Sequence, residues 1–94
     1  MTFSEDQVRA RLSELDGWSY DGKDLVRLCV FPSFMDAIRF VGRVAEAAES
    51  ANHHPNIDIR YDSVRLAVHT HSENGVTERD FALAKEIDRA INIA

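Results

Sequence analysis

Hydrophobic residues near the start of the chain recur at the spacing of an amphipathic helix. Val8 and Leu12 lie one turn apart, and Ser4 followed three residues later by Gln7 forms a capping-box pattern in front of them. An Asp-Gly pair, which favours a turn, comes after the last apolar residue of this series. We therefore expect a first helix over residues 5–15.

Two stretches of alternating hydrophobic and polar residues each surround a turn signal. The first contains the segment 18–20 and the β-rich segment 25–31, separated by an Asp-Gly pair. The second contains 57–61 and 64–70, separated by an Asp-Ser pair. Because strands joined by short turns pair antiparallel, these stretches predict two β-hairpins.

Two further helices are predicted, one between the hairpins and one after them. Ser33 can cap a long apolar and alanine-rich helix that ends near Asn52. Thr77, with Asp80 three residues on, can start a last helix whose apolar series reaches Ile91. The predicted fold is α+β in the order α-β-β-α-β-β-α, with a four-stranded antiparallel sheet, three helices packed on one face and the other face open.

Composition and charge narrow the class of protein. The 94 residues are 45% hydrophobic and 29% charged, without a linker-like or repetitive stretch, so we expect one domain over 1–94. The net charge of -5 and the scattered Lys and Arg disfavour direct binding of nucleic acid. No apolar run approaches the ~20 residues of a membrane span, and the acidic start is unlike a signal peptide. We expect a cytoplasmic protein that does not bind membranes.

One cysteine and four histidines are the candidates for reactive chemistry. Cys29 lies between apolar neighbours and is interpreted as a buried structural thiol. His53 and His54 lie where the long helix turns into a loop fixed by Pro55, and His71 is expected to close a strand beside the next loop. An imidazole has a pKa of ~6.5 and can donate or accept a proton near neutral pH. The pattern therefore favours acid–base chemistry in a cleft.

Two carboxylates are placed to support these histidines. Glu49 precedes His53 by one helical turn, and Asp80 lies in the first turn after the loop that follows His71. Each could orient an imidazole or bind an amino-rich heterocycle. Alternatively, Glu49 is a solvated helix residue and Asp80 serves only as the helix cap with Thr77.

A metal site is the main competing interpretation of the histidines. His69 and His71 are two apart on a predicted strand and share one face, and His53 or His54 could complete the set. Against this, the adjacent His53 and His54 side chains tend to diverge, and no cysteine ligand accompanies them. We expect His69 to be an ordinary exposed strand residue. For His54, the alternative is a capping role at the end of the long helix, where a protonated imidazole would interact favourably with the helix dipole.

The spacing of these residues resembles one known family. The string Glu49-x3-His53-His54-Pro55-x5-Tyr61-x9-His71-x8-Asp80 is similar to the signature of the pterin-4a-carbinolamine dehydratases. The resemblance covers nearly the whole chain and departs from related sequences at the rim, where Ser72 replaces an acid, Asn74 a glycine and His69 a small polar residue.

The resemblance implies both an assembly and a reaction. The expected assembly is a homodimer or homotetramer formed through sheet edges and the long helix. The expected reaction converts 4a-hydroxytetrahydropterin, left by an aromatic amino acid hydroxylase, to quinonoid dihydropterin and water, and it requires no cofactor or metal. By the same resemblance, His53 and His71 transfer protons and His54 holds and polarises the substrate. The residues that shape or support the pocket are Glu49, Pro55, Thr70, Ser72 and Asp80.

A function of a different class stays open at this point. Relatives of this fold serve as dimerisation cofactors of transcription factors and as assembly factors for a carboxylase. The alternative to the dehydratase is therefore a non-catalytic interaction protein on the same fold.

Overall fold

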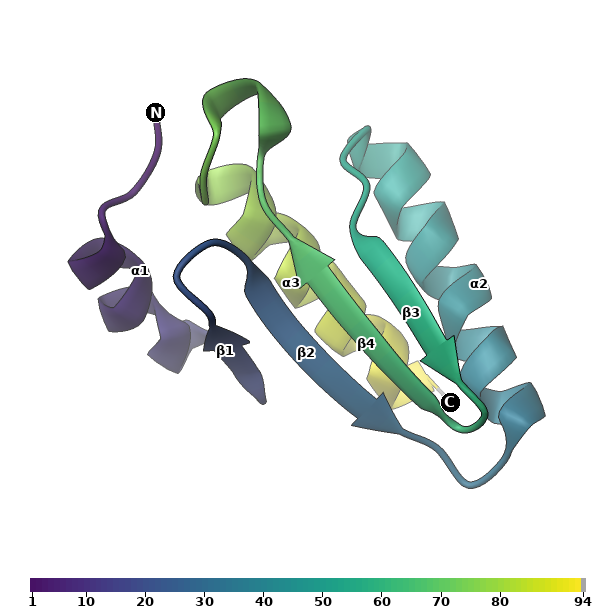
Figure 1. The fold of residues 1–94 in the computed structure, drawn as a ribbon. Helices are drawn as coiled ribbons and strands as arrows, with labels where there is room; N and C mark the ends of the chain where they lie inside the picture. The colour runs from purple at the N-terminus through teal and green to yellow at the C-terminus, as the bar shows by residue number, and fades with distance from the viewer. Residues whose placement is uncertain (94) are drawn as a thin grey trace.

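Helices and strands follow the predicted order along the chain. The structure, a computed structural model, describes residues 1–93 (Figure 1). Its elements are α1 (Glu5–Arg11), the 3-10 turn η1 (Leu12–Glu14), β1 (Trp18–Tyr20), β2 (Leu25–Val30), α2 (Phe34–Ala51), β3 (Asn56–Arg60), β4 (Ser63–Val68), the 3-10 turn η2 (His71–Glu73) and α3 (Glu78–Ile93).

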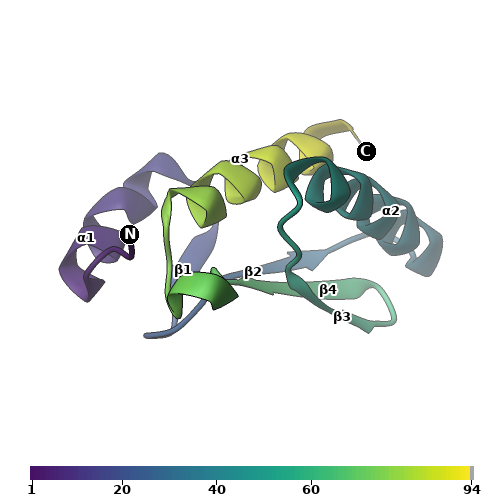
Figure 2. The same ribbon diagram turned by 90° about the horizontal axis from the view of Figure 1, so that it is seen from above.

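The four strands form one antiparallel sheet in the order β1-β2-β4-β3. Each predicted hairpin is present, and the two hairpins join through β2 and β4, where Leu25 pairs with Val68 and Cys29 with Val64. The helices α1, α2 and α3 all lie over one face of this sheet (Figure 2). The predicted α+β architecture is confirmed.

The core lies between the sheet and the helices. Leu25 and Cys29 of β2 and Val64, Leu66 and Val68 of β4 lie at alternate positions, point to the helices and are buried, as the strand period requires. They pack with residues of α2 and α3 in one cluster, whose largest members are Phe40, Phe81, Leu25, Leu66, Leu83 and Ile87. Cys29 belongs to this cluster, and burial raises the pKa of its thiol, so the interpretation as a structural cysteine is confirmed.

The predicted helix caps are present. The Gln7 N–H donates to Ser4 Oγ at 3.2 Å while the Ser4 N–H donates to Gln7 Oε1 at 2.7 Å, which is a complete capping box. The Asp36 N–H donates to Ser33 Oγ at 3.1 Å at the start of α2. The first helix is shorter than predicted, because regular α-helix ends at Arg11 and η1 replaces its last turn.

The last strand also ends earlier than predicted. β4 stops at Val68, and Thr70 instead forms an isolated bridge with Gly75, in which the Thr70 N–H donates to the Gly75 carbonyl at 2.8 Å. The residues between them form η2, and Asn74 closes this loop with a left-handed φ of 55°. His71 therefore opens a tight turn and does not close a strand, which corrects the prediction.

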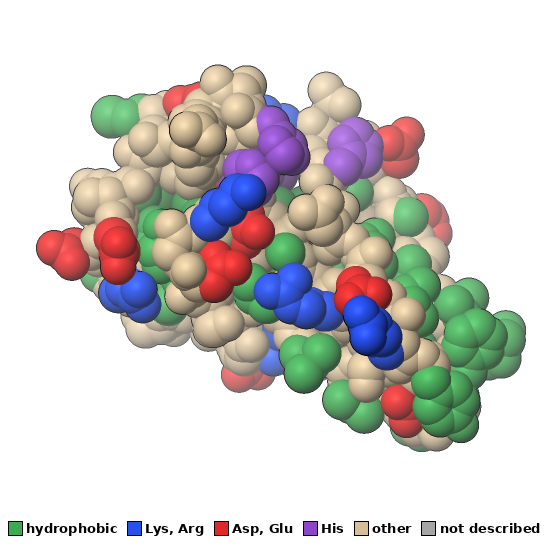
Figure 3. Space-filling model, viewed as in Figure 1, with side chains coloured by type: hydrophobic (Ala, Val, Ile, Leu, Met, Phe, Trp, Pro, Cys, Tyr) green, Lys and Arg blue, Asp and Glu red, His purple; other side chains and the backbone are tan. Residues whose placement is uncertain are grey.

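Three element ends meet at one end of the molecule. The C-terminus of α2, the exit of β4 and the start of α3 lie together at the top of Figure 1. This end, and not the open face of the sheet, holds the histidines (Figure 3). Among residues 1–93, no helix is long and apolar enough to cross a membrane.

Candidate active site

The end of α2 directs two neighbouring histidines to different surroundings. Asn52 caps the helix in the left-handed conformation, with a φ of 49°, which asparagine tolerates better than most residues. The His53 N–H then donates to the Ala48 carbonyl at 3.0 Å, so the chain turns back across the helix end. His53 points inward and is 7% exposed, whereas the side chain of His54 is 56% exposed.

The buried imidazole is held by a buried carboxylate. His53 Nε2 lies 2.5 Å from Asp80 Oδ1, and Asp80 has no exposed surface. The other oxygen, Asp80 Oδ2, accepts from Thr70 Oγ1 at 2.9 Å and from the Thr77 N–H at 2.8 Å. Because an ionised carboxylate only accepts, Nε2 of a neutral His53 carries the proton and Nδ1 is left as the acceptor.

Asp80 combines two predicted roles in one side chain. Its bond to the Thr77 N–H completes the cap of α3, and the Thr77 hydroxyl accepts from the Arg79 N–H at 3.2 Å. Its bond to His53 ties the same helix end to the end of α2. Capping and orientation of an imidazole are therefore not alternatives here.

Three of the four histidines line one cavity. Its volume is about 200 Å³, and it is bordered by Asn52, His53, His54, Thr70, His71, Ser72 and Arg79. A neighbouring cavity of about 260 Å³ shares His53 and Arg79 with it. The predicted convergence of imidazoles from the α2 exit and the β4 exit on one space is present in the structure.

The predicted support residues divide into three groups. Thr70 and Ser72 border the cavity with the histidines. Asp80 lies behind His53 and Thr70 and is closed off from the cavity. Glu49 and Pro55 do not border it, and the Glu49 carboxylate lies 2.5 Å from His54 Nε2 at the outside, so its imidazole partner is His54.

His69 differs from its predicted state as an exposed strand residue. It lies just beyond the end of β4 and is only 8% exposed. Its Nδ1 is 2.6 Å from Asp24 Oδ1, and its ring packs against the ring of His71. The prediction was wrong because a strand pattern cannot show that Asp24, which precedes β2, lies beside it.

Metal binding is not indicated by the described residues. Among residues 1–93, no three His, Cys, Asp or Glu side chains gather closely enough to hold a metal ion. His69 and His71 do lie together, as their spacing predicted, but among residues 1–93 no third ligand side chain gathers with them. The cavity itself offers imidazoles, hydroxyls and a guanidinium.

Sequence reasoning missed Arg79 as a site residue. Its Nη2 donates to the Asn52 carbonyl at 2.8 Å, which links the start of α3 to the end of α2, and the residue borders both cavities. One signal was available, because a basic residue in the first turn of a helix opposes the helix dipole and requires a local reason. The main-chain partner itself could not be foreseen.

Known proteins place this arrangement in a family. A small α+β fold brings three imidazoles to one cavity, and an imidazole can donate or accept a proton near neutral pH. The family model described as pterin 4 alpha carbinolamine dehydratase matches residues 1–90. The chain belongs to this family, which is one of hydro-lyases.

Individual relatives agree over almost the full length. A Mycobacteroides abscessus protein with the provisional name pterin-4-alpha-carbinolamine dehydratase is 48% identical over 88 residues, covering 94% of each chain. A Thermomicrobium roseum protein with the same provisional name is 50% identical over 80 residues, covering 85% of this chain and 86% of its own. The crystal structure of a transcriptional coactivator/pterin dehydratase from Brucella melitensis superposes with a TM-score of 0.90 at 35% identity, covering 96% of this chain and 98% of its own.

Proposed function

We propose that this chain dehydrates a 4a-hydroxytetrahydropterin to quinonoid dihydropterin and water, with His53 and His71 as the proton-transfer residues. The observation that carries the proposal is the single cavity bordered by His53, His54 and His71. Family membership supplies the substrate class, and the cavity supplies groups that can serve it.

The elimination needs two proton transfers on a flat bicyclic ring. The bond from C4a to the hydroxyl oxygen breaks, the hydroxyl leaves with an added proton as water, and N5 loses its proton as the C4a=N5 double bond forms. Two imidazoles held on either side of the ring can perform both steps, and such positioned groups typically contribute 10²- to 10⁴-fold each.

The surroundings of the two imidazoles suggest how they share this work. The Asp80 carboxylate at 2.5 Å would stabilise the imidazolium formed when His53 accepts the N5 proton through Nδ1. His71 is exposed to water, from which it can recover the proton that it gives to the leaving hydroxyl. His54, backed by Glu49, would hold the substrate.

The test compares His53→Ala and His71→Ala with the wild type in a dehydration assay. Each variant is expected to lose about 10²-fold or more of the acceleration above the spontaneous rate. Arg39→Ala, an exposed side chain in α2, is the control and should retain the wild-type rate. Wild-type acceleration in both histidine variants would overturn the assignment of roles.

The same assay separates the two classes of function. Folded wild-type protein that does not exceed the spontaneous rate would contradict the dehydratase and favour the non-catalytic interaction role.

The proposal places the chain after an enzyme that leaves a 4a-hydroxylated pterin, such as an aromatic amino acid hydroxylase, in the recycling of tetrahydropterin.

Assembly into a homodimer or homotetramer is part of the proposal. Large apolar side chains are exposed at the end of the molecule opposite the histidines, and Figure 3 shows them gathered there. Val30 at the end of β2 is 68% exposed, and Phe34 and Met35 at the start of α2 are 45% and 50% exposed; an apolar patch of this kind commonly marks a protein interface. Light scattering on the purified protein measures the subunit number, and a monomer at micromolar concentration would reject this part.

A further inference from the structure

Outside the proposed proton-transfer residues, the chain contains a second buried carboxylate–imidazole pair. His69 Nδ1 lies 2.6 Å from Asp24 Oδ1, and both side chains are largely buried, with 9% and 14% of their surfaces exposed. The two residues are brought together by the sheet, because the adjacent pair Leu25 and Val68 are register partners on β2 and β4. The carboxylate accepts the Nδ1 proton and so selects one tautomer and one orientation of the His69 ring.

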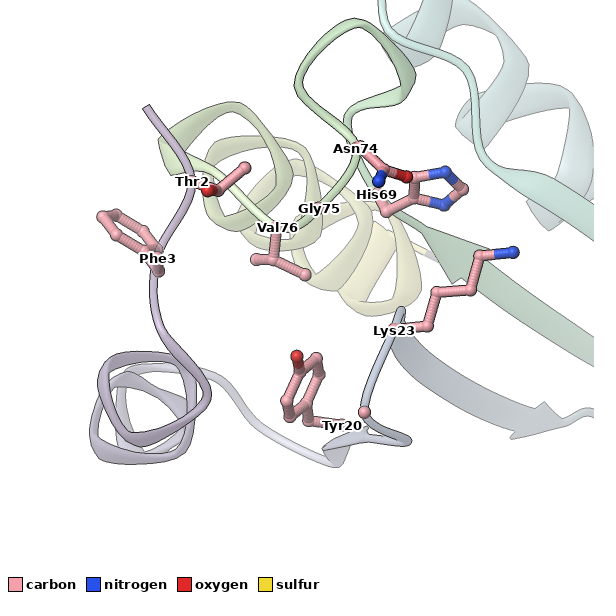
Figure 4. Close-up of a pocket in the computed structure, with 9 residues that line it drawn as sticks. Thr2, Phe3, Tyr20, Lys23, His69, Asn74, Gly75 and Val76 are labelled. Atoms are coloured by element: carbon pink, nitrogen blue, oxygen red, sulfur yellow. The ribbon is translucent and has the colours of Figure 1, made fainter.

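The oriented ring of His69 packs against the ring of His71. The two ring centroids are 4.1 Å apart and the rings are inclined at 61°, an edge-to-face contact of the kind that stabilises aromatic pairs. In Figure 4 the His69 ring turns away from Phe3 and Tyr20, which lie across a small neighbouring cavity. His69 also borders that cavity, but its ring packs against the ring of His71.

Apart from this ring contact, the His71 side chain is weakly restrained. It is exposed, it opens the three-residue turn η2, and its side chain makes no hydrogen bond to another of residues 1–93. His53, in contrast, is fixed directly by Asp80. The packing of His69 is thus the contact that restricts the orientation of the His71 ring.

We propose that Asp24 and His69 form a positioning pair that holds the His71 imidazole at the mouth of the cavity. This inference rests on the proposed function, in which His71 transfers a proton, and it assigns a role to a histidine and an aspartate outside the family signature found in this chain. Second-layer partners of this kind typically change activity by about 10-fold to 100-fold when they are removed.

Substitutions at position 69 separate positioning from a merely structural role. His69→Ala removes the ring and should lower kcat about 10-fold with little change in KM, because the substrate still binds but the proton donor is mobile. His69→Phe keeps a flat ring against His71 and should restore most of kcat. Asp24→Ala should approach the effect of His69→Ala, and Lys23→Ala, its exposed neighbour, should retain wild-type kcat.

Nuclear magnetic resonance of the His71 ring gives a readout that does not depend on the reaction. His69→Ala should shift the His71 ring proton signals, because they lose the ring current of the neighbour, and His69→Phe should keep them displaced. If His69→Ala leaves the His71 signals unchanged, or shifts them without lowering kcat, the inference is overturned. If the wild type is inactive while the His71 signals respond as expected, the proposed dehydration fails and the positioning of His71 stands.

Discussion

The two sides of the cavity are built differently. His53 is buried, bonded to a buried carboxylate, and connected through that carboxylate to Thr70 and to the cap of α3. His71 is exposed on a three-residue turn and is restrained by a ring contact alone. His53 therefore belongs to the buried hydrogen-bond network that joins two helices, whereas His71 lies outside that network on the surface. We therefore expect substitutions on the first side to change stability and activity together, and substitutions on the second side to change activity alone.

The largest effect is expected when the shared carboxylate is removed. Asp80→Ala leaves the Thr77 N–H, the Thr70 hydroxyl and His53 Nε2 without their acceptor in a buried place. We expect the free energy of unfolding to fall by about 3 kcal/mol, measured by urea denaturation. Glu78→Gln, an exposed change in the same helical turn, is the control and should cost less than about 1 kcal/mol. Equal losses in both variants would show that the buried network contributes no more to the free energy of unfolding than an exposed ion pair.

A smaller loss is expected when one donor of the network is removed without a change of shape. Thr70→Val deletes the hydroxyl that lies 2.9 Å from Asp80 Oδ2 and 2.8 Å from Thr77 Oγ1. The free energy of unfolding should fall by about 1 to 2 kcal/mol in urea denaturation. Ser72→Ala in the neighbouring turn η2 is the matched control, because its hydroxyl is exposed, and it should leave stability unchanged.

A substitution at His71 should lower activity without lowering stability. His71→Ala removes an exposed side chain and should change the free energy of unfolding by less than about 0.5 kcal/mol. Its dehydration rate should nevertheless fall by about 100-fold. Parallel melting and rate measurements on His53→Ala should show losses in both quantities. Comparable destabilisation of the two histidine variants would break the comparison between the two sides.

The smallest effect is expected at the exposed pair of Glu49 and His54. The two side chains are 78% and 56% exposed, and the carboxylate does not border the cavity. Glu49→Gln should raise KM about threefold and leave kcat and the urea midpoint unchanged, because ion pairs in water contribute little. A loss of kcat as large as that of His71→Ala would place Glu49 in direct contact with the substrate.

Local patterns in the sequence were sufficient for most of the fold. The strand alternation, the turn pairs and the capping residues each act over a few neighbouring positions, so they can be read without knowing the tertiary structure. The errors fall at the ends of two elements, α1 and β4, which are both shorter than predicted. β4 stops at Val68 because Thr70 bridges to Gly75, and this closes the loop that makes His71 the start of a turn.

For the site, the shared cleft could be predicted from the sequence, but the partners of the histidines could not. The spacing of His53, His54 and His71 on either side of a hairpin was enough to expect a shared cleft, and the structure has one. The partners of these histidines could not be assigned, because a carboxylate near in sequence need not be near in space. Glu49 pairs with His54, and Asp80 pairs with His53.

Local spacing and residue type predicted the order of elements, the hydrophobic faces and the candidate histidines of the site, since each of these depends on neighbouring positions in the chain. Which groups hold those histidines depends on contacts that form only when the chain is folded. Asp24 meets His69, and Arg79 meets the carbonyl of Asn52, through pairing and packing of segments far apart in the chain. Such contacts follow from how the sheet and helices assemble, and no local pattern encodes them.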